Sequence, residues 1–302
     1  MAKGQRWSII ANPVSGRGKG RRMASRVAEL LARAGVDVDL EWTTRQGDAE
    51  QLAIHALEKG VRGLLICGGD GTLHEAINGL LSGTPHPEEV TIGLIPAGRC
   101  NDFRACLDLP KEPRRIVDAV LYGKARKIDL GRVGTRYYAT VATLGFDSAV
   151  SQYVADGRAP RFLAGTPAYL YAVFVQLVRY RDIRVCLRGD SLDFDGRVFL
   201  AATGNTPNYG GRLMIAPGAL VDDGLLDLCL VRAVSRRDVL RMLPRIFNGS
   251  HVKHSAVSLH QVRTLSIETE EPMWIWADGE RVSRTPATIE VVPGALSVLE
   301  SP

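Results

Sequence analysis

The sequence predicts a two-domain protein of the α/β plus all-β class, in which a parallel-sheet domain precedes an antiparallel β-sandwich. Over the first 130 residues, short apolar runs alternate with segments of helical spacing, which is typical of a parallel sheet with helices on both faces. From about residue 129, short runs rich in β-branched and aromatic residues are separated by Gly, Asp and Pro, as in antiparallel sheets. A chain of 302 residues is also long enough for two hydrophobic cores. We therefore expect domains at 1–129 and 130–302, with the extreme C-terminus packing back on the first domain.

Four strand–helix pairs make up the predicted α/β domain. Apolar runs predict strands at 7–11, 36–42, 63–67 and 90–96. Helical spacing predicts helices after residue 20, from Asp48 as N-cap, over 73–81 and over 114–123. Ligands of such sheets bind beyond the carboxyl ends of the strands. We therefore expect the turns at 12–20, 68–72 and 96–103 to converge.

The second domain is predicted to contain eight β-rich runs, two helices and one long loop. The runs begin near residues 127, 136, 182, 197, 225, 264, 273 and 287. Helices are predicted at 163–178, which is strongly apolar, and at 236–247, which has basic and apolar faces. The first helix is either a core helix or one that accepts an acyl chain, with Arg179 and Arg181 on anionic headgroups. Segment 204–228 has little apolar periodicity, and its length indicates a functional loop.

The composition narrows the class of protein. With 45% hydrophobic and 24% charged residues, the chain is typical of a folded protein. Its net charge of +5 favours an anionic substrate or surface, but it is too small to predict a nucleic-acid partner. No apolar leader or membrane span is visible, so we expect a cytoplasmic protein that is peripheral to the inner face of the membrane. The five cysteines form no CxxC pair and are expected to be free thiols.

The turn GGDGT, residues 68–72, places Asp70 among glycines between a strand and a helix. Such glycines let a backbone approach a nucleotide closely, and a carboxylate beside phosphates requires a bridging cation. Mg²⁺ suits that position, because it is commonly bound by one or two carboxylates together with phosphates. The alternative is a tight turn in which Asp70 caps its own helix.

Other turns add polar groups. In NPVSG (12–16), backbone N–H groups at a helix start favour phosphate, although an ordinary turn before a solvated basic helix is an equal alternative. Carboxylates and an amide near further strand ends suit Mg²⁺ and phosphoryl transfer. The residues at these positions are Asn12, Ser15, Gly16, Asn101, Asp102 and Asp129. Asp223 and the segment Asp278–Glu280 are candidates in the second domain, with Asp-Gly hairpin turns as the alternative. Zinc, serine-hydrolase, Walker and GxGxxG motifs are absent.

Together these stretches resemble the diacylglycerol kinase catalytic-domain family, which includes bacterial lipid kinases and the sphingosine and ceramide kinases. They occur in family order over nearly the whole chain, whereas GGDGT alone is shared with NAD kinases and phosphofructokinase-like proteins. The shared stretches are NPVSG (12–16), GGDGT (68–72), PAGRCNDF (96–103), GFD (145–147), GN (204–205), APGALVDDGLLD (216–227) and DGE (278–280).

The resemblance implies a Rossmann-like, phosphofructokinase-like ATP-binding domain and a β-sandwich domain for the lipid, with the active site in the cleft between them. It implies that Glu280 is the general base and that a structural Mg²⁺ is held by Asp223 and the backbone carbonyls of Leu220 and Leu225. From their positions in the turns, we expect Asp70, Asp102 and Asp129 to be further catalytic carboxylates, with a catalytic Mg²⁺ at Asp70, directly or through water. The resemblance implies ATP contacts at Thr43, at the turn Gly68 to Thr72 and at the position of Arg99, and the full set of expected ATP-binding residues is Asn12, Ser15, Gly16, Thr43, Gly68, Gly69, Asp70, Gly71, Thr72, Glu75, Arg99 and Asn101.

One motif departs from the family pattern. Relatives usually have PxGTxNDFAR where this chain has PAGRCNDFRA, so that Arg99 replaces a threonine and Cys100 a small residue. Arg99 either meets a phosphate, blocks the adenine side of the nucleotide site or alters the donor preference.

We expect an ATP- and Mg²⁺-dependent lipid kinase that phosphorylates a hydroxyl of a membrane lipid such as diacylglycerol. The alternatives are a sphingoid-base or ceramide kinase, a soluble alcohol kinase similar to NAD kinases, and a lipid-binding protein with weak catalysis. An exposed sheet edge also leaves a homodimer open.

Overall fold

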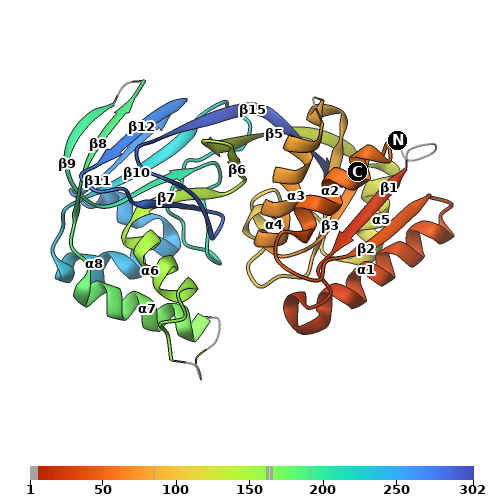
Figure 1. The fold of residues 1–302 in the computed structure, drawn as a ribbon, viewed down its shortest axis with the longest axis horizontal. Helices are drawn as coiled ribbons and strands as arrows, with labels where there is room; N and C mark the ends of the chain where they lie inside the picture. Colours follow the sequence, from red (N-terminus) through yellow and green to blue (C-terminus); the bar gives the residue numbers. More distant parts are fainter. Residues whose placement is uncertain (1–5, 85, 161–162, 164–165, 191) are drawn as a thin grey trace. The chain divides into compact units, whose positions relative to one another are not determined.

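The computed structural model describes residues 6–84, 86–160, 163, 166–190 and 192–302 (Figure 1). The chain forms two compact units. The first comprises Met1–Leu130, Val221–Gly224 and Val292–Pro302, and the second comprises Gly131–Leu220 and Leu225–Val291. Strands β5 (Lys124–Val133) and β15 (Ala287–Glu300) each run from one unit into the other.

A parallel sheet forms the centre of the first unit. It contains β1 (Trp7–Ala11), β2 (Val38–Trp42), β3 (Gly63–Gly68), β4 (Thr91–Pro96) and the C-terminal part of β15, in the order β2-β1-β3-β4-β15. Every residue of β1 and β3 is buried, as expected for continuous apolar strands covered on both faces. The predicted parallel α/β architecture is confirmed.

Helices cover both faces of this sheet. Helices α1 (Ser15–Arg33) and α5 (Pro113–Tyr122) share one hydrophobic cluster with β1 and β3. Helices α2 (Asp48–Glu58) and α3 (Asp70–Gly83) pack closely on each other. This packing requires glycine at position 79, because a Cβ there would lie 2.2 Å from the carbonyl oxygen of Glu50. The short elements η1 (Pro87–Glu89) and α4 (Asp102–Cys106) complete the unit.

Asp48 differs from the prediction. It is the first residue of α2 rather than its N-cap, which is Gly47. Its carboxylate accepts hydrogen bonds from the backbone N–H groups of Thr44 and Arg45. Asp48 therefore stabilises the turn before the helix and not the first helical turn.

Antiparallel strands dominate the second unit. They follow the order β14-β13-β7-β9-β8-β12-β15, with β10 on β9 and β11 on β10. The strands are β6 (Arg136–Tyr138), β7 (Val141–Gly145), β8 (Ile183–Gly189), β9 (Asp193–Gly204), β10 (Leu226–Arg232), β11 (Val257–Val262), β12 (Thr264–Thr269), β13 (Trp274–Ala277) and β14 (Glu280–Arg284). The predicted antiparallel β-sandwich is confirmed, although β11 and β14 were not expected.

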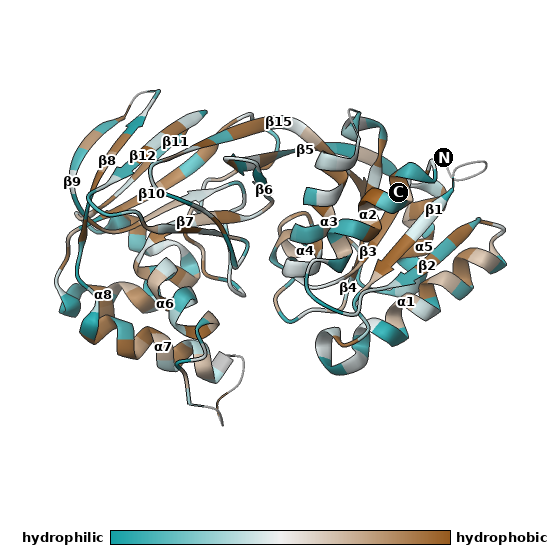
Figure 2. Ribbon diagram, in the orientation of Figure 1, coloured by the Kyte–Doolittle hydropathy of each residue, from teal (hydrophilic) through white to brown (hydrophobic). Residues whose placement is uncertain are grey.

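The described residues of the same unit form three α-helices and two 3₁₀ helices: α6 (Phe146–Ala155), α7 (Thr166–Arg179), α8 (Arg236–Met242), η2 (Leu243–Asn248) and η3 (Ser250–Lys253). The α-helices lie together on one side of the sheet, and all three contribute to one hydrophobic cluster (Figure 1). The predicted helix 163–178 corresponds to α7, and its positions 164–165 lie outside the described residues. In the described part of the chain, no helix has the length and apolar character needed to cross a membrane. Figure 2 shows hydrophobic residues on the central strands and along α7.

Candidate functional site

The three predicted turns meet at the carboxyl edge of the parallel sheet. The N–H of Asn12, after β1, donates to the carbonyl of Cys67 at the end of β3 over 2.8 Å. Gly16 has φ +57°, and a Cβ there would lie 2.2 Å from the carbonyl oxygen of Ala97, after β4. The expected convergence of the turns is therefore observed within the first unit.

Two of these turns are packed backbone against backbone. A Cβ on Gly98 would lie 2.3 Å from the Cα of Gly69, and one on Gly68 would lie 2.4 Å from Oγ1 of Thr72. Thr72 is buried. Glycine is thus required at these positions by contacts within the protein, whether or not a nucleotide also approaches them.

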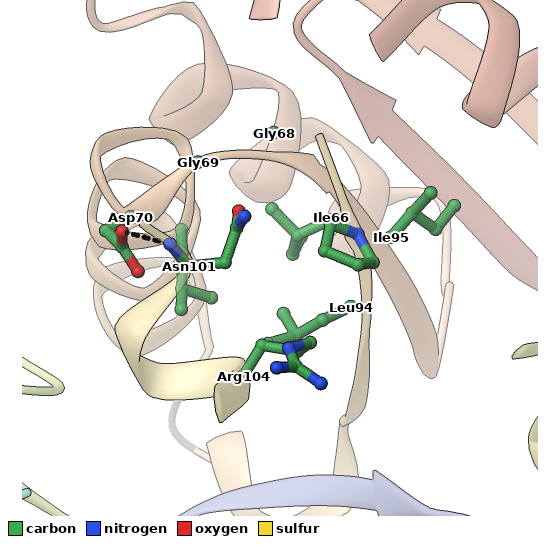
Figure 3. Close-up of a pocket in the computed structure, with 10 residues that line it drawn as sticks. Ile66, Gly68, Gly69, Asp70, Leu94, Ile95, Asn101 and Arg104 are labelled. Atoms are coloured by element: carbon green, nitrogen blue, oxygen red, sulfur yellow. Dashed lines mark hydrogen bonds between the residues drawn. The ribbon is translucent and has the colours of Figure 1, made fainter. Parts of the chain in front are cut away.

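Asp70 links the GGDGT turn to the turn after β4. Its Oδ2 accepts a hydrogen bond of 2.9 Å from the backbone N–H of Asn101, as Figure 3 shows. Asp70 is the first residue of α3, and the N-cap position is occupied by Gly69. The carboxylate therefore joins two turns, and the alternative in which Asp70 is the N-cap of its own helix is not observed.

The side chain of Asn101 shapes the turn that carries Arg99. Its amide donates to the carbonyl of Gly98 over 2.8 Å and accepts from the N–H of Gly98 over 3.1 Å. The residue has a left-handed φ of +51°, which asparagine adopts more readily than most residues. Asp102 follows as the buried first residue of α4. The loop tip, Arg99 and Cys100, is exposed.

A shallow pocket of about 250 Å³, including solvent space, opens beside the Asp70–Asn101 contact (Figure 3). Its floor is apolar and comes from β3, β4 and α3, including Ile66, Leu73 and Leu94. Its polar lining comes from Asp70, Asn101 and Arg104.

Exposed basic residues follow the NPVSG turn. The side chain of Asn12 accepts from the Val14 N–H, and its carbonyl accepts from the Ser15 N–H, so Asn12 holds the turn. Left-handed backbone continues from Gly16 through Gly18 before the regular helix begins. The exposed cations on this segment are Arg17, Lys19, Arg21 and Arg22. Positive side chains and a helix start at one sheet edge suit a polyphosphate.

Two further predicted residues lie close to this edge. Thr43 is buried directly after β2, and its N–H donates to the carbonyl of Ala11. Glu75 on α3 accepts a hydrogen bond of 3.2 Å from the N–H of Ala49, in the first turn of α2. Glu75 therefore caps a neighbouring helix start.

Asp129 does not join a cluster of carboxylates. It is buried, and its two oxygens accept from the N–H groups of Gly224 and Gly294 over 2.6 and 2.7 Å. Among the described residues, no group of three or more His, Cys, Asp or Glu side chains could hold a metal ion. Asp129 therefore holds the Val221–Gly224 segment and the turn at Gly294, and the catalytic role expected for Asp70, Asp102 and Asp129 stays a prediction.

Asp223 lies exposed in this same segment. The segment is also anchored by Arg126, which donates to the carboxylate of Asp222. The assignment of a structural Mg²⁺ to Asp223 with the carbonyls of Leu220 and Leu225 stays a prediction.

Glu280 is positioned by a tight hairpin in the second unit. Asp278 and Gly279 both have positive φ, +51° and +86°, which is the geometry of a two-residue turn between β13 and β14. The carboxylate of Asp278 accepts from the N–H groups of Ala139 and Thr140 over 2.8 and 2.9 Å, and so fixes the hairpin to the segment before β7. The hairpin alternative is therefore correct for Asp278–Gly279, and Glu280 is the first residue of β14, half-buried.

A second candidate region is an apolar cavity within the second unit, of about 690 Å³ including solvent space. Its walls come from α6, α7, β9, β10, α8, η2, η3 and the 205–225 loop, and include Val173, Leu213, Val239 and Ile246. Pockets of this size and lining typically bind small apolar ligands.

Among the described residues that line the cavity, Asp147 in the GFD stretch is the one with a carboxyl group. Burial raises the pKa of Asp147, and hydrogen bonds from Tyr169, Thr143 and Tyr209 oppose that shift. The Tyr169 hydroxyl donates over 2.8 Å and the Thr143 hydroxyl over 3.1 Å. Asp147 thus ties α7 to β7.

The sequence did not predict this cavity. Its lining residues lie on seven helices and strands and on one loop, and only the apolar character of α7 and the length of the 204–228 loop suggested a functional region. His251, assigned no role from the sequence, is buried and also lines the cavity.

Comparison with known proteins gives one consistent result for both units. Residues 6–133 match the family described as diacylglycerol kinase catalytic domain, and residues 140–300 match that described as YegS C-terminal NAD kinase beta sandwich-like domain. A diacylglycerol kinase of Mycobacterium tuberculosis is 36% identical over 300 residues, covering 97% of this chain and 94% of that protein. One from Staphylococcus carnosus is 31% identical, covering 94% and 91%. A crystal structure of a diacylglycerol kinase from Bacillus anthracis has a TM-score of 0.79 at 22% identity, covers 99% and 98%, and therefore shows the same fold.

Proposed function

This chain belongs to the diacylglycerol kinase family, and from that premise we propose that it transfers the γ-phosphoryl group of ATP to the hydroxyl of diacylglycerol. As a family member it is a lipid kinase with an alcohol acceptor and ATP as phosphate donor. The choice of diacylglycerol follows the names of its relatives. The observation that carries the proposal is the meeting of the NPVSG, GGDGT and NDF turns at one sheet edge, joined by the Asp70–Asn101 hydrogen bond.

We assign the ATP phosphates to this sheet edge. The starts of α1, α3 and α4 all lie there, and exposed Arg17, Lys19 and Arg99 supply positive charge. Arg99 offers a planar set of donors that suits a phosphate better than the usual threonine does. We expect Asn12, Asn101 and Thr72 to act mainly by holding the turns in shape.

A magnesium ion fits the donor chemistry at Asp70. The carboxylate is an oxygen ligand that a hard cation prefers, and Mg²⁺ commonly uses one or two carboxylates together with substrate phosphates. Bound Mg²⁺ would neutralise charge on the transferred phosphoryl group.

Glu280 is the proposed general base. An alcohol is a poor nucleophile at neutral pH, so a carboxylate near the hydroxyl must accept its proton as the oxygen attacks. The hydrogen bonds of Asp278 fix the hairpin and with it the backbone of Glu280. A general base has to be held in a fixed position relative to the hydroxyl group. We assign Asp129 a structural role, because both of its carboxylate oxygens accept hydrogen bonds from backbone N–H groups.

The apolar cavity of the second unit is the proposed site for an acyl chain of the acceptor. A soluble alcohol or NAD would gain little from a cavity lined by Val173, Leu213 and Val239. This observation favours a lipid kinase over a soluble alcohol kinase. The choice of acceptor, whether diacylglycerol, a sphingoid base or ceramide, and of its chain length then depends on how each lipid fills the cavity.

The test is transfer of label from γ-labelled ATP to a panel of acceptors, comprising diacylglycerol, a sphingoid base, ceramide and NAD. We expect Mg²⁺-dependent labelling of diacylglycerol above the others. Asp70→Asn should abolish labelling, whereas Asp118→Asn, an exposed aspartate on α5 of the same unit, should leave it unchanged. Labelling of NAD alone, or of no acceptor, would contradict the proposal.

A further inference from the structure

Glu280, the proposed general base, lies between two residues that are each attached to another part of the second unit. On its N-terminal side, the carboxylate of Asp278 accepts hydrogen bonds from backbone N–H groups before β7. On its C-terminal side, the guanidinium group of Arg281 donates a hydrogen bond of 2.8 Å to Oδ1 of Asp156. The short stretch of chain that carries the base is therefore attached at both ends.

The attachment through Arg281 leads to the helix that borders the apolar cavity. Asp156 follows directly after α6 and is its C-cap. At the other end of the same helix, Phe146 and Asp147 line the cavity. One end of α6 thus forms part of the cavity wall, and the other end binds the strand of the proposed base.

Two tryptophans of β13 also contact the guanidinium group of Arg281. Its Cζ atom lies 5.3 Å from the ring centroid of Trp276 and 5.8 Å from that of Trp274. Trp276 is buried and is paired with Arg281 in the register of the two strands. Because the face of an indole ring attracts a cation, this contact favours the same side-chain position as the ion pair does.

The cation also offsets an unfavourable position of Asp156. A carboxylate at the C-terminal end of a helix is repelled by the helix dipole. Hydrogen bonds from Gln152 and Arg281 nevertheless lower the pKa of Asp156, so the pair is ionised at neutral pH. The side chains of Arg281 and Asp156 are 35% and 25% exposed, and solvent therefore screens their attraction less than that of a fully exposed pair.

Strand β14 needs an attachment of this kind because of its place in the sheet. It stands at the end of the strand order, where it pairs with β13. An edge strand is held by backbone hydrogen bonds along one side only. Glu280 and Arg281 are consecutive in β14, so their side chains project from opposite faces of the strand. Arg281 can therefore fix the strand from one face while Glu280 is presented on the other.

We propose that Arg281 is a positioning residue for the general base, and that its ion pair with Asp156 fixes Glu280 relative to the acceptor cavity. This inference rests on the proposed function, because that function makes Glu280 the base. A base is effective only within hydrogen-bond distance of the proton it accepts. A β14 strand released from α6 would hold Glu280 in the reactive position for a smaller fraction of the time.

Hydrogen–deuterium exchange tests the attachment without relying on catalysis. In Arg281→Gln, the backbone N–H groups of β14 should exchange about tenfold faster, because the strand separates from β13 more often. The matched control is Arg184→Gln, which breaks an ion pair with Asp195 between β8 and β9 of the same unit. Exchange in β14 should not change in the control. Equal exchange of β14 in Arg281→Gln and the wild type would overturn the inference.

Steady-state kinetics tests whether Arg281 acts through Glu280. Arg281→Gln should lower kcat about tenfold and change KM for ATP and for the acceptor by less than about twofold. Arg281→Lys retains the charge and should recover part of kcat. In the Glu280→Gln background, adding Arg281→Gln should leave the residual kcat unchanged, because no base remains to be positioned. A further tenfold loss in that background would contradict a positioning role.

A double-mutant cycle tests the partner. Asp156→Asn should lower kcat by the same factor as Arg281→Gln, and the double variant Arg281→Gln/Asp156→Asn should lose no more than either single variant, because both changes break one ion pair. Losses that multiply in the double variant would show that the two side chains act separately, and would overturn the inference.

The same variants separate this inference from the proposed function. If the wild type labels no acceptor while β14 exchanges faster in Arg281→Gln, the attachment is upheld and the kinase function is rejected. If the wild type labels diacylglycerol and Glu280→Gln does not, but Arg281→Gln has the kcat of the wild type, the kinase function is upheld and the positioning role is rejected.

Discussion

The edge of three turns in the first unit and the cavity in the second unit are built in opposite ways. At the edge, backbone is packed on backbone, as between Gly69 and Gly98, and a carboxylate fastens one turn to the next. The cavity is enclosed mainly by apolar side chains from many elements, and its described lining includes the carboxyl group of Asp147. The first arrangement suits a ligand recognised by charge and fixed geometry, and the second suits one recognised by apolar shape.

This difference also explains what the sequence could reveal. The turn motifs are contiguous, so GGDGT and NPVSG predicted the edge and its position at the strand ends. The cavity has no contiguous signature, because Val173, Leu213 and Val239 are ordinary apolar residues until the fold brings them together.

Glu280→Gln should have the largest effect on activity. The amide cannot accept the acceptor's proton, so kcat should fall by about 10²–10⁴-fold. The Asp278 hairpin stays intact, and binding of ATP should be unchanged. Glu268→Gln, an exposed glutamate on β12, is the matched control. Turnover by Glu280→Gln equal to that of the wild type would show that the base has been assigned to the wrong residue.

Gly98→Ala should damage the edge and spare the cavity. The new Cβ would lie 2.3 Å from the Cα of Gly69, so the two turns must separate, at a cost of about 1–3 kcal/mol in unfolding free energy. The affinity for ATP should fall, as measured by calorimetric titration. Gly60→Ala has no heavy atom within 4 Å of its new Cβ and a φ of +77°, and should cost only about 1 kcal/mol without affecting ATP. If the Gly98→Ala variant bound ATP as tightly as the wild type, the nucleotide site would not lie at this sheet edge.

Val173→Trp should have the converse effect. The indole would occupy part of the cavity, raising KM for long-chain diacylglycerol by about tenfold, which corresponds to about 1.4 kcal/mol of binding. The affinity for ATP should not change. Steady-state kinetics with acceptors of different chain length measures the effect, and an unchanged KM for every chain length would place the lipid elsewhere.

Asp147→Asn should give the smallest change, visible in the pH dependence of stability. Burial raises the pKa of Asp147 in the folded protein above its unfolded value of about 3.9. The unfolded state therefore loses this proton at lower pH than the folded state does. Stability of the wild type should decrease as pH rises from the unfolded pKa through the folded one.

In Asp147→Asn, this decrease should be absent, because the amide does not titrate. Denaturant unfolding at a series of pH values measures the difference. Parallel pH profiles for the two proteins would show that the folded pKa is not raised.

Particular residues show the limits of prediction within the motifs themselves. The Asp-Gly pair at 278–279 predicted a turn, but only the structure shows that Asp278 binds the N–H groups of Ala139 and Thr140 and so fixes Glu280. Asp129 looked like a third catalytic carboxylate, whereas its partners are the N–H groups of Gly224 and Gly294, far along the chain. Roles that depend on a short contiguous motif could be predicted from the sequence. Hydrogen bonds between residues more than 90 positions apart could not.

The most direct test of the lipid-kinase assignment is mass spectrometry of lipids from cells that express the wild-type protein or Glu280→Gln at equal levels. The account predicts that phosphorylated diacylglycerol accumulates with the wild type and not with the variant. Accumulation with both proteins, or of a phosphorylated soluble alcohol in place of a lipid, would contradict it.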